Sequence, residues 1–194
     1  GIMPNEDRDA AEVVQQSIMR DGVRLLCCGK DLRVERTATG KRLLVDSHGQ
    51  HYDVTVDEIL VGVGRSPNVE GLGLETIGVE YDKTGVKVND RLQTTNSRIY
   101  AAGDICSRYK FTHAADAMAQ IVIQNALFPH PFGLGYASME SLIMPWCTFT
   151  KPEIAHVGLY EADAKKKGLE IETYTYKLGE VDRAILDGEQ EGFA

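Results

Sequence analysis

The sequence lacks the cysteine spacings that build metal cages and redox loops. Its four cysteines stand at positions 27, 28, 106 and 147, with no C-x2-C or C-x4-C pair among them. Zinc sites and dithiol redox motifs depend on such spacings. The histidines at positions 48, 51, 130 and 156 share no ligand spacing either. No metal-ligating residue and no redox disulfide loop are therefore predicted.

Long apolar runs and an excess of positive charge are also missing. The longest apolar stretches are broken by Gly, Gln or Asn within about ten residues, too few to cross a membrane. Lys and Arg number 21 against 29 Asp and Glu, which gives a net charge of −8 without any basic block. Neither nucleic acid nor a membrane is therefore predicted as a partner. With 43% hydrophobic and 26% charged residues, the composition is typical of a soluble globular protein.

Both ends of the 194 residues look like breaks within a longer chain. The first four residues, GIMP, contain no initiator methionine and begin no signal-peptide pattern, and the chain stops at Ala194 without a polar tail. We expect a piece of a longer, cytoplasmic chain. The adjacent Cys27 and Cys28 are interpreted as small apolar strand residues in a reducing compartment, with a vicinal disulfide as the alternative.

A complete glycine-rich phosphate loop is absent as well. The stretches GVGRSP at 62–67 and GLGLET at 71–76 carry the first two glycines of G-x-G-x-x-G, but Pro67 and Thr76 stand where the third belongs. These glycines are predicted to mark a strand end and a turn.

Hydrophobic periodicity predicts three blocks of structure. The first begins with a helix over 9–21 that ends at Gly22. Strands are then expected at 23–28, at 41–46 and 51–56 around a turn at 47–50, and at 58–64.

The second block contains a hairpin over 78–88 with its turn at 83–85, a strand at 98–102 and a helix over 112–127. This helix is apolar nearly all round, so we expect it to be buried on more than one side. After a Pro- and Gly-rich linker at 128–138, residues 144–178 are expected to form strand, strand, helix and strand.

The stretch RIYAAGDI at 98–105 ends an apolar run on Gly103 and Asp104. A parallel strand of a doubly wound sheet delivers the residues at its carboxyl end to the crevice where cofactors bind. Glycine permits close approach of a ligand, the carboxylate accepts hydrogen bonds from sugar hydroxyls, and the helix beginning near Thr112 adds its positive dipole end. The alternative is an ordinary turn in which Asp104 serves as a cap.

Five segments resemble the FAD- and NAD(P)-dependent pyridine nucleotide-disulfide oxidoreductases, in that family's order. TTNSRIYAAGD resembles the second flavin-binding fingerprint, with Thr94 and Asp104 in register, and EILVGVGRSPN is similar to the passage from the NAD(P) domain to the FAD domain. The other three are similar to the second half of the NAD(P) domain, the flavin-facing helix start and the opening of the dimerisation domain: MPNEDRDAAEVV, FTHAADAMAQ and FTKPEIAHVGLYEADAKKKG.

The resemblance implies an α/β fold, with partial Rossmann-like FAD- and NAD(P)-binding domains followed by the start of an α+β dimerisation domain. The implied boundaries are 1–65 for the NAD(P) part, 66–142 for the FAD part and 143–194 for the truncated dimerisation domain. The implied parent is a homodimer that passes electrons from NAD(P)H through FAD to a small-molecule redox substrate. Among branches, the mercuric reductase-like and dihydrolipoamide dehydrogenase-like one is favoured.

The resemblance also implies which residues meet the cofactors. The family's redox Cys-x4-Cys and its His-Glu pair lie in halves that this sequence does not contain, so no catalytic residue is assigned. Arg65 is expected either to approach the nicotinamide nucleotide or to pair with a carboxylate, and for His113 a positioning role is favoured over proton transfer. The predicted cofactor-binding residues are Gly64, Arg65, Gly103, Asp104, Thr112, His113 and Ala114.

Two other functions stay open at this point. One is a non-catalytic oligomerisation or binding fragment. The other is a flavin NAD(P)H oxidoreductase without the disulfide, such as a ferredoxin reductase or an NADH oxidase. The residues do not distinguish mercuric ion from dihydrolipoamide or another disulfide as the substrate, nor NADH from NADPH.

Overall fold

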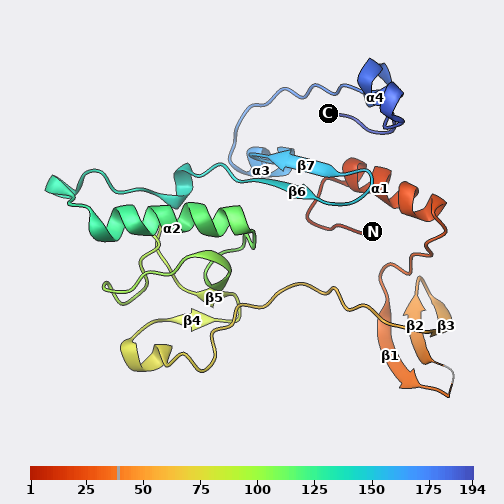
Figure 1. Cartoon of the computed structure of the whole chain (residues 1–194), viewed down its shortest axis with the longest axis horizontal. Helices are drawn as coiled ribbons and strands as arrows, with labels where there is room; N and C mark the ends of the chain where they lie inside the picture. Colours follow the sequence, from red (N-terminus) through yellow and green to blue (C-terminus); the bar gives the residue numbers. More distant parts are fainter. Residues whose placement is uncertain (39) are drawn as a thin grey trace. The chain divides into compact units, whose positions relative to one another are not determined.

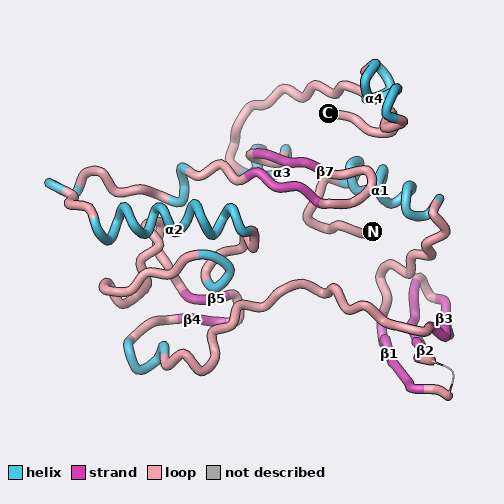
Figure 2. The backbone as a smooth tube through the Cα atoms, in the orientation of Figure 1, coloured by secondary structure: helices cyan, strands magenta, loops and turns pink. Residues whose placement is uncertain are grey.

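The computed structural model describes residues 1–38 and 40–194. The chain forms two compact units, and Figure 1 shows the path of the chain through their helices and strands. Unit 1 consists of residues 1–61 and 145–194, and unit 2 of residues 62–144. Short helices and strands are joined by long connecting segments in both (Figure 2).

Unit 1 begins with helix α1 (Arg8–Arg20), which confirms the predicted helix. Ala11 and Val14 form its buried face. After the helix the chain turns at Gly22, whose φ of 88° lies in the left-handed region that glycine adopts without strain. Helix α1 therefore ends where the sequence indicated.

A three-stranded antiparallel sheet follows, in the order β1-β2-β3. Strands β2 (Lys41–Ser47) and β3 (Gln50–Val56) form the predicted hairpin, in register from Lys41 opposite Val56 to Ser47 opposite Gln50. Strand β1 (Lys30–Arg36) was not predicted. Its sequence, KDLRVER, is exposed along its whole length, so it carries no alternating apolar signal.

The strand predicted at 23–28 is wrong. These residues form an irregular segment that ends in a turn at Cys27 and Cys28, and Cys28 has a φ of 59°. A left-handed residue interrupts the extended backbone that a strand requires. The interpretation of the two cysteines as strand residues is therefore also wrong.

The second part of unit 1 contains the antiparallel pair β6 (Pro145–Thr148) and β7 (Ile154–Val157), then α3 (Glu161–Lys166). This confirms the predicted strand, strand and helix. The strand expected after them is wrong. Tyr176 exchanges backbone hydrogen bonds with Ala194, but this pairing does not extend far enough to form a strand. The unpredicted η5 (Leu178–Glu180) and α4 (Asp182–Asp187) follow.

Glu6 joins the start of unit 1 to these strands. Its carboxylate accepts hydrogen bonds from Trp146 Nε1 at 3.1 Å, Thr148 Oγ1 at 3.0 Å and the Tyr160 hydroxyl at 2.6 Å. Partial burial disfavours the charged carboxylate and is the largest single influence, but the three donors together outweigh it, so the pKa of Glu6 lies below its ordinary value of 4.5. The ring of His156 stacks against Tyr160 beside this cluster.

We expect Glu6→Gln to lower the free energy of unfolding at pH 7 by about 1 to 2 kcal/mol, because it removes charge-assisted hydrogen bonds in a partly exposed position. A carboxyl whose folded pKa is depressed stabilises the fold above its unfolded pKa, and this contribution is lost as the pH falls through the folded pKa. Urea unfolding measured from pH 7 down to pH 3 should therefore show a smaller acid-side loss for Glu6→Gln than for the unchanged chain. Glu12→Gln, on the exposed face of α1, is the matched control and should keep the full acid-side loss. Identical pH profiles for Glu6→Gln and Glu12→Gln would contradict the prediction.

Unit 2 packs around a small apolar core. Strands β4 (Tyr81–Asp82) and β5 (Gly85–Val86) form the predicted hairpin. One cluster of buried residues in this unit consists of Leu74, Val79 and Val86. The unit also contains the short helices η1 (Leu74–Ile77), η2 (Gly103–Ile105), η3 (Pro131–Gly133) and η4 (Met139–Ser141), and helix α2 (Thr112–Leu127).

The strands predicted at 58–64 and 98–102 are wrong. The first stretch is an extended segment in which Leu60 is 98% and Val63 is 91% exposed. In the second, Tyr100 forms only an isolated antiparallel bridge with Gln93. A strand needs a neighbour that pairs along its length, and all strand pairings among the described residues are antiparallel. Among the residues that the structure describes, no parallel strand therefore leads to Asp104.

Helix α2 confirms the predicted helix but not its predicted burial. One stripe is buried, formed by Ala114, Met118, Ile121 and Asn125. Ile123 and Leu127, on the other faces, are exposed. The helix is therefore covered on a single side in this chain, and the expectation of burial on several sides is wrong.

Candidate functional site

The candidate site lies in unit 2, at the turn η2 and the start of α2, which pack against each other. Gly103 has a φ of 80°, and a Cβ atom there would lie 3.1 Å from Ala115 Cβ on the helix. Its N–H donates to Met118 Sδ at 3.2 Å, and its carbonyl accepts from Cys106 N at 3.1 Å. Glycine is thus required both for the backbone conformation and for the close packing of the turn on α2.

Asp104 stands in the middle of this turn with its side chain 48% exposed. In the part of the chain that the structure describes, its carboxylate forms an ion pair with Arg65 Nη1 at 3.9 Å, and the turn has no side-chain cap. The structure gives no support to the alternative in which Asp104 is a turn cap. The carboxylate oxygens are therefore accessible to hydroxyl donors of a ligand.

Lys110 holds the loop between the turn and the helix. Its Nζ donates to the carbonyl of Asp104 at 2.8 Å and to that of Ser107 at 3.2 Å. Both bonds go to backbone oxygens, so they fix the path of the loop without using the Asp104 carboxylate. The carboxylate is thereby held on a defined backbone.

Helix α2 begins at Thr112, after Phe111 in an extended conformation and without a side-chain cap. The first helical hydrogen bond runs from Ala115 N to Phe111 O at 3.0 Å. The N–H groups of the first turn, at Thr112, His113 and Ala114, therefore point out of the helix end, where the dipole is positive. The first turn contains no acidic residue that would neutralise this end.

The side chain of His113 stacks on Phe111, with ring centroids 5.4 Å apart and planes 7° apart. A ring held flat against an aromatic neighbour is suited to positioning. This geometry agrees with the favoured interpretation of His113, and its role stays a prediction.

Arg65 reaches the site from an extended segment, with its side chain 74% exposed. Its guanidinium forms an ion pair with the Asp104 carboxylate, although the two residues are far apart in sequence. This agrees with the alternative in which Arg65 pairs with a carboxylate. The preceding Gly64 has a φ of 102°, and a Cβ atom there would meet nothing within 4 Å. Gly64 is therefore required for its backbone conformation and not for a close approach.

The nearest thiol to the site is not a reactive one. Cys106 is partly buried, and desolvation raises the pKa of its thiol to about 11. Its Sγ lies 3.6 Å from the Gly103 carbonyl oxygen. At neutral pH this cysteine is a neutral thiol, so it contributes packing and no nucleophile.

These features fit a flavin in their chemistry. A carboxylate on a glycine turn accepts from hydroxyl groups, and a helix start stabilises a ring edge that gains negative charge. The described residues contain no group of three or more His, Cys, Asp or Glu side chains arranged to hold a metal ion. The donor set is therefore suited to a polyhydroxylated organic cofactor.

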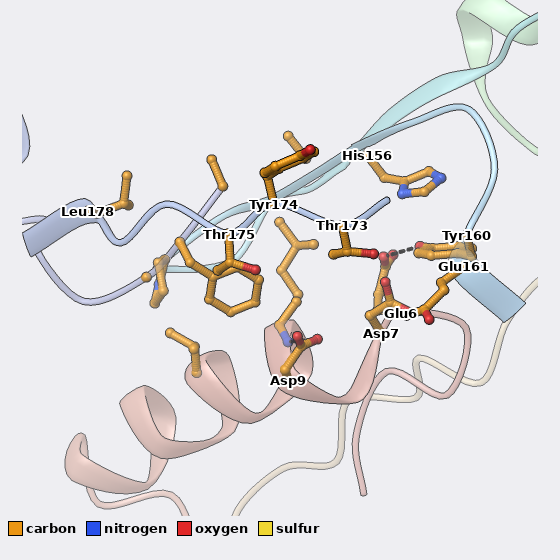
Figure 3. Close-up of a pocket in the computed structure, with 18 of the residues that line it drawn as sticks. Glu6, Asp7, Asp9, His156, Tyr160, Glu161, Thr173, Tyr174, Thr175 and Leu178 are labelled. Carbon is orange, nitrogen blue, oxygen red and sulfur yellow. Dashed lines mark hydrogen bonds between the residues drawn. The ribbon is translucent and has the colours of Figure 1, made fainter. Parts of the chain in front are cut away.

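Sequence reasoning missed a pocket of about 650 Å³ in unit 1. Figure 3 shows Glu6, Asp7 and Asp9 on one side of it and Thr173, Tyr174 and Thr175 on the other. Its lining comes from α1, β7, α3 and the segments 169–178 and 191–194. These parts are far apart in the sequence, so no local sequence signal could have revealed the pocket. The hydrogen bond between Tyr160 and Glu6 lies at its edge (Figure 3).

Comparison with known proteins identifies the family to which this fold belongs. Residues 1–119 match the model of the pyridine nucleotide-disulphide oxidoreductases, and residues 144–194 match that family's dimerisation domain. The chain belongs to the pyridine nucleotide-disulphide oxidoreductase family. This confirms the resemblance and the predicted fold class, whereas the predicted domain boundaries stay a prediction.

Individual relatives cover nearly the whole chain. A mercuric reductase of Staphylococcus aureus is 36% identical over 187 residues, 96% of this chain and 33% of the relative. A dihydrolipoyl dehydrogenase of Bacillus subtilis (strain 168) is 28% identical, over 99% of this chain and 40% of the relative. The solved structure of the HOCl-induced flavoprotein disulfide reductase RclA from Escherichia coli is similar with a TM-score of 0.80 at 26% identity, covering 100% of this chain and 43% of that one.

The chain therefore spans about a third to two fifths of the length of these relatives. The relatives are oxidoreductases, and both the family's name and the description of RclA as a flavoprotein agree with the NAD(P)H and FAD that the resemblance implies. Among the described residues, none of the helices is both long enough and apolar enough to span a membrane.

Proposed function

We propose that this chain is part of a flavin-dependent disulfide oxidoreductase, in which electrons pass from NAD(P)H through FAD to a disulfide or metal-thiol substrate. The observation that carries the proposal is the Asp104 carboxylate, half exposed on a glycine turn that packs against the start of α2. Bound FAD would supply the hydride acceptance and electron transfer that no side chain provides.

The residues of this chain contribute binding and orientation. Asp104 accepts hydrogen bonds from the hydroxyl groups of the flavin's sugar chain. The start of α2, at Thr112, His113 and Ala114, places its positive dipole end where the flavin ring gains charge on reduction. Arg65 pairs with the Asp104 carboxylate when no flavin hydroxyl group does. Its alternative role is to approach the nicotinamide nucleotide. No catalytic residue is proposed within the chain.

The homodimer is proposed from the match of residues 144–194 to a dimerisation domain. The same match favours the disulfide-reducing branch over a ferredoxin reductase or an NADH oxidase. A small-molecule redox substrate is proposed from the relatives, with no role for nucleic acid or a membrane. A cytoplasmic location is proposed because all four cysteines are free, as in a reducing compartment.

The proposal is tested by substituting Asp104 in the complete flavoprotein that contains this chain. Asp104→Ala removes charge-assisted hydrogen bonds, each worth about 1.5 to 3 kcal/mol, so flavin affinity should fall about tenfold or more. Asp104→Asn keeps an acceptor and should lose less. Flavin dissociation followed by fluorescence provides the measurement.

Glu70→Ala is the matched control, because Glu70 is an exposed acid of the same unit outside the site. It should leave flavin affinity unchanged. If Asp104→Ala retained flavin as tightly as Glu70→Ala while its melting temperature fell, Asp104 would be a structural residue and the proposed function would lose its main support.

A further inference from the structure

The adjacent Cys27 and Cys28 lie in a turn, whereas the sequence predicted a strand. In a strand, successive side chains point to opposite faces, and the two thiols would be separated. Here the residues form a turn, and Cys28 has a φ of 59°, so the strand alternation does not apply. Both thiols are free, with Cys28 exposed and Cys27 partly exposed.

The turn is fastened to strand β2 on both sides of the pair. The buried Ser47 donates from Oγ to the carbonyl of Cys27 at 2.6 Å. On the other side, a Cβ atom on Gly29 would lie 3.0 Å from Val45 Cγ2, and Lys30 pairs with Asp46. The fold therefore holds the backbone of the dithiol in place before any ligand arrives, which reduces the entropy lost on binding.

A direct bond between the two sulfurs is poorly suited to this position. The Cα atoms of neighbouring residues lie about 3.8 Å apart across a trans peptide, whereas disulfides usually join Cα atoms about 4.4 to 6.8 Å apart. An atom inserted between the sulfurs relieves this mismatch. Structural zinc requires four ligands, and among the described residues no third His, Cys, Asp or Glu side chain joins the pair as a ligand set.

We propose that Cys27 and Cys28 form a bidentate site for trivalent arsenic compounds. Trivalent arsenic forms three bonds, of which two can go to the cysteine sulfurs and one to a further group. With phenylarsine oxide, two As–S bonds form, both S–H bonds and the As–O bond break, and the oxygen leaves as water with the two thiol protons. No oxidation or reduction occurs. The site is independent of the flavin site and of the function proposed above.

The pair is distinguished from the other two cysteines by its surroundings. Cys106 is a partly buried neutral thiol, and desolvation likewise raises the pKa of Cys147 above its ordinary value. These two are distant from each other in sequence and lie in different units. They provide the internal comparison for the test.

Phenylarsine oxide is added to the 194-residue chain, and bound arsenic and remaining free thiols are measured by mass spectrometry and thiol titration. The unchanged chain and the C106S/C147S double variant should each bind one phenylarsenic group with the loss of two thiols. Cys27→Ser and Cys28→Ser each leave only one thiol of the pair, so retention against excess monothiol should fall about 100-fold, as expected when the second attachment is lost.

Circular dichroism verifies that each variant keeps the secondary structure of the unchanged chain. The proposal is overturned if Cys27→Ser or Cys28→Ser retains phenylarsine oxide like the unchanged chain. It is equally overturned if the C106S/C147S variant fails to bind, or if peptide mapping locates the arsenic on Cys106 or Cys147.

Discussion

Replacing Gly85 with alanine is expected to lower the free energy of unfolding of unit 2 by about 3 kcal/mol, the sum of a backbone and a packing cost. Gly85 has a φ of 127°, and a Cβ atom there would clash with the carbonyl oxygen of Ile105. The obstructing atom belongs to the backbone, so no side-chain rotation relieves the clash. Thermal and urea unfolding measure the loss.

Gly78→Ala is the matched control for Gly85→Ala. Gly78 has a φ of 69°, but a Cβ atom there would meet nothing within 4 Å, so only the left-handed conformation is penalised, by about 1 to 2 kcal/mol. Equal losses for the two variants would show that the approach of Gly85 to Ile105 contributes nothing to stability.

Gly85→Ala is also expected to disturb the proposed flavin site in the complete protein that contains this chain. Ile105 follows Asp104 in η2, which β5 contacts from one side. Displacing the Ile105 backbone moves the turn that carries the carboxylate, and hydrogen bonds weaken steeply with distorted geometry. We therefore expect Gly85→Ala to reduce flavin affinity, whereas Gly78→Ala should not.

The second large effect is expected at Met118, which holds the turn from the side of the helix. Met118 is completely buried and accepts the hydrogen bond from Gly103 N. Met118→Ala removes most of a buried side chain, and such a truncation costs about 2 to 5 kcal/mol. Met118→Leu preserves the volume and should cost less than about 1.5 kcal/mol.

The pair of Met118 variants separates packing from support of the site. Both lose the sulfur acceptor of Gly103, but only Met118→Ala also leaves a cavity beneath η2. Ile123→Ala, on the exposed side of the same helix, is the control for helix truncation and should change stability by less than about 1 kcal/mol. A loss for Met118→Ala no larger than that for Ile123→Ala would contradict the proposed packing.

The elements that the sequence predicted correctly share a local origin. Helices α1 and α2 follow from their periodic apolar residues, and the hairpin of β2 and β3 from alternating strands around a short turn. These signals depend on residues within a few positions of one another. The same holds for the family motifs, since each resemblance rests on a continuous segment.

The incorrect strands fail for the opposite reason. The stretches at 23–28, 58–64 and 98–102 have apolar residues suited to a sheet, but a strand exists only where a second backbone supplies hydrogen bonds. Strand β1 illustrates the converse, because its charged sequence KDLRVER becomes a strand through its pairing with β2. Propensity alone could not distinguish these cases.

The sequence by itself determined the family, the helices and the positions of Gly103 and Asp104 at the end of an apolar run, because these depend on residue types at short spacings. Only the tertiary structure decided that Arg65 pairs with Asp104, that Met118 supports the turn of Gly103 and Asp104, and that Glu6 accepts a hydrogen bond from Trp146. It also decided that Cys27 and Cys28 stand in a turn fastened to Ser47. Each of these contacts joins residues distant in the chain, and such pairs are selected by the free energy of packing the whole unit, which no local pattern encodes.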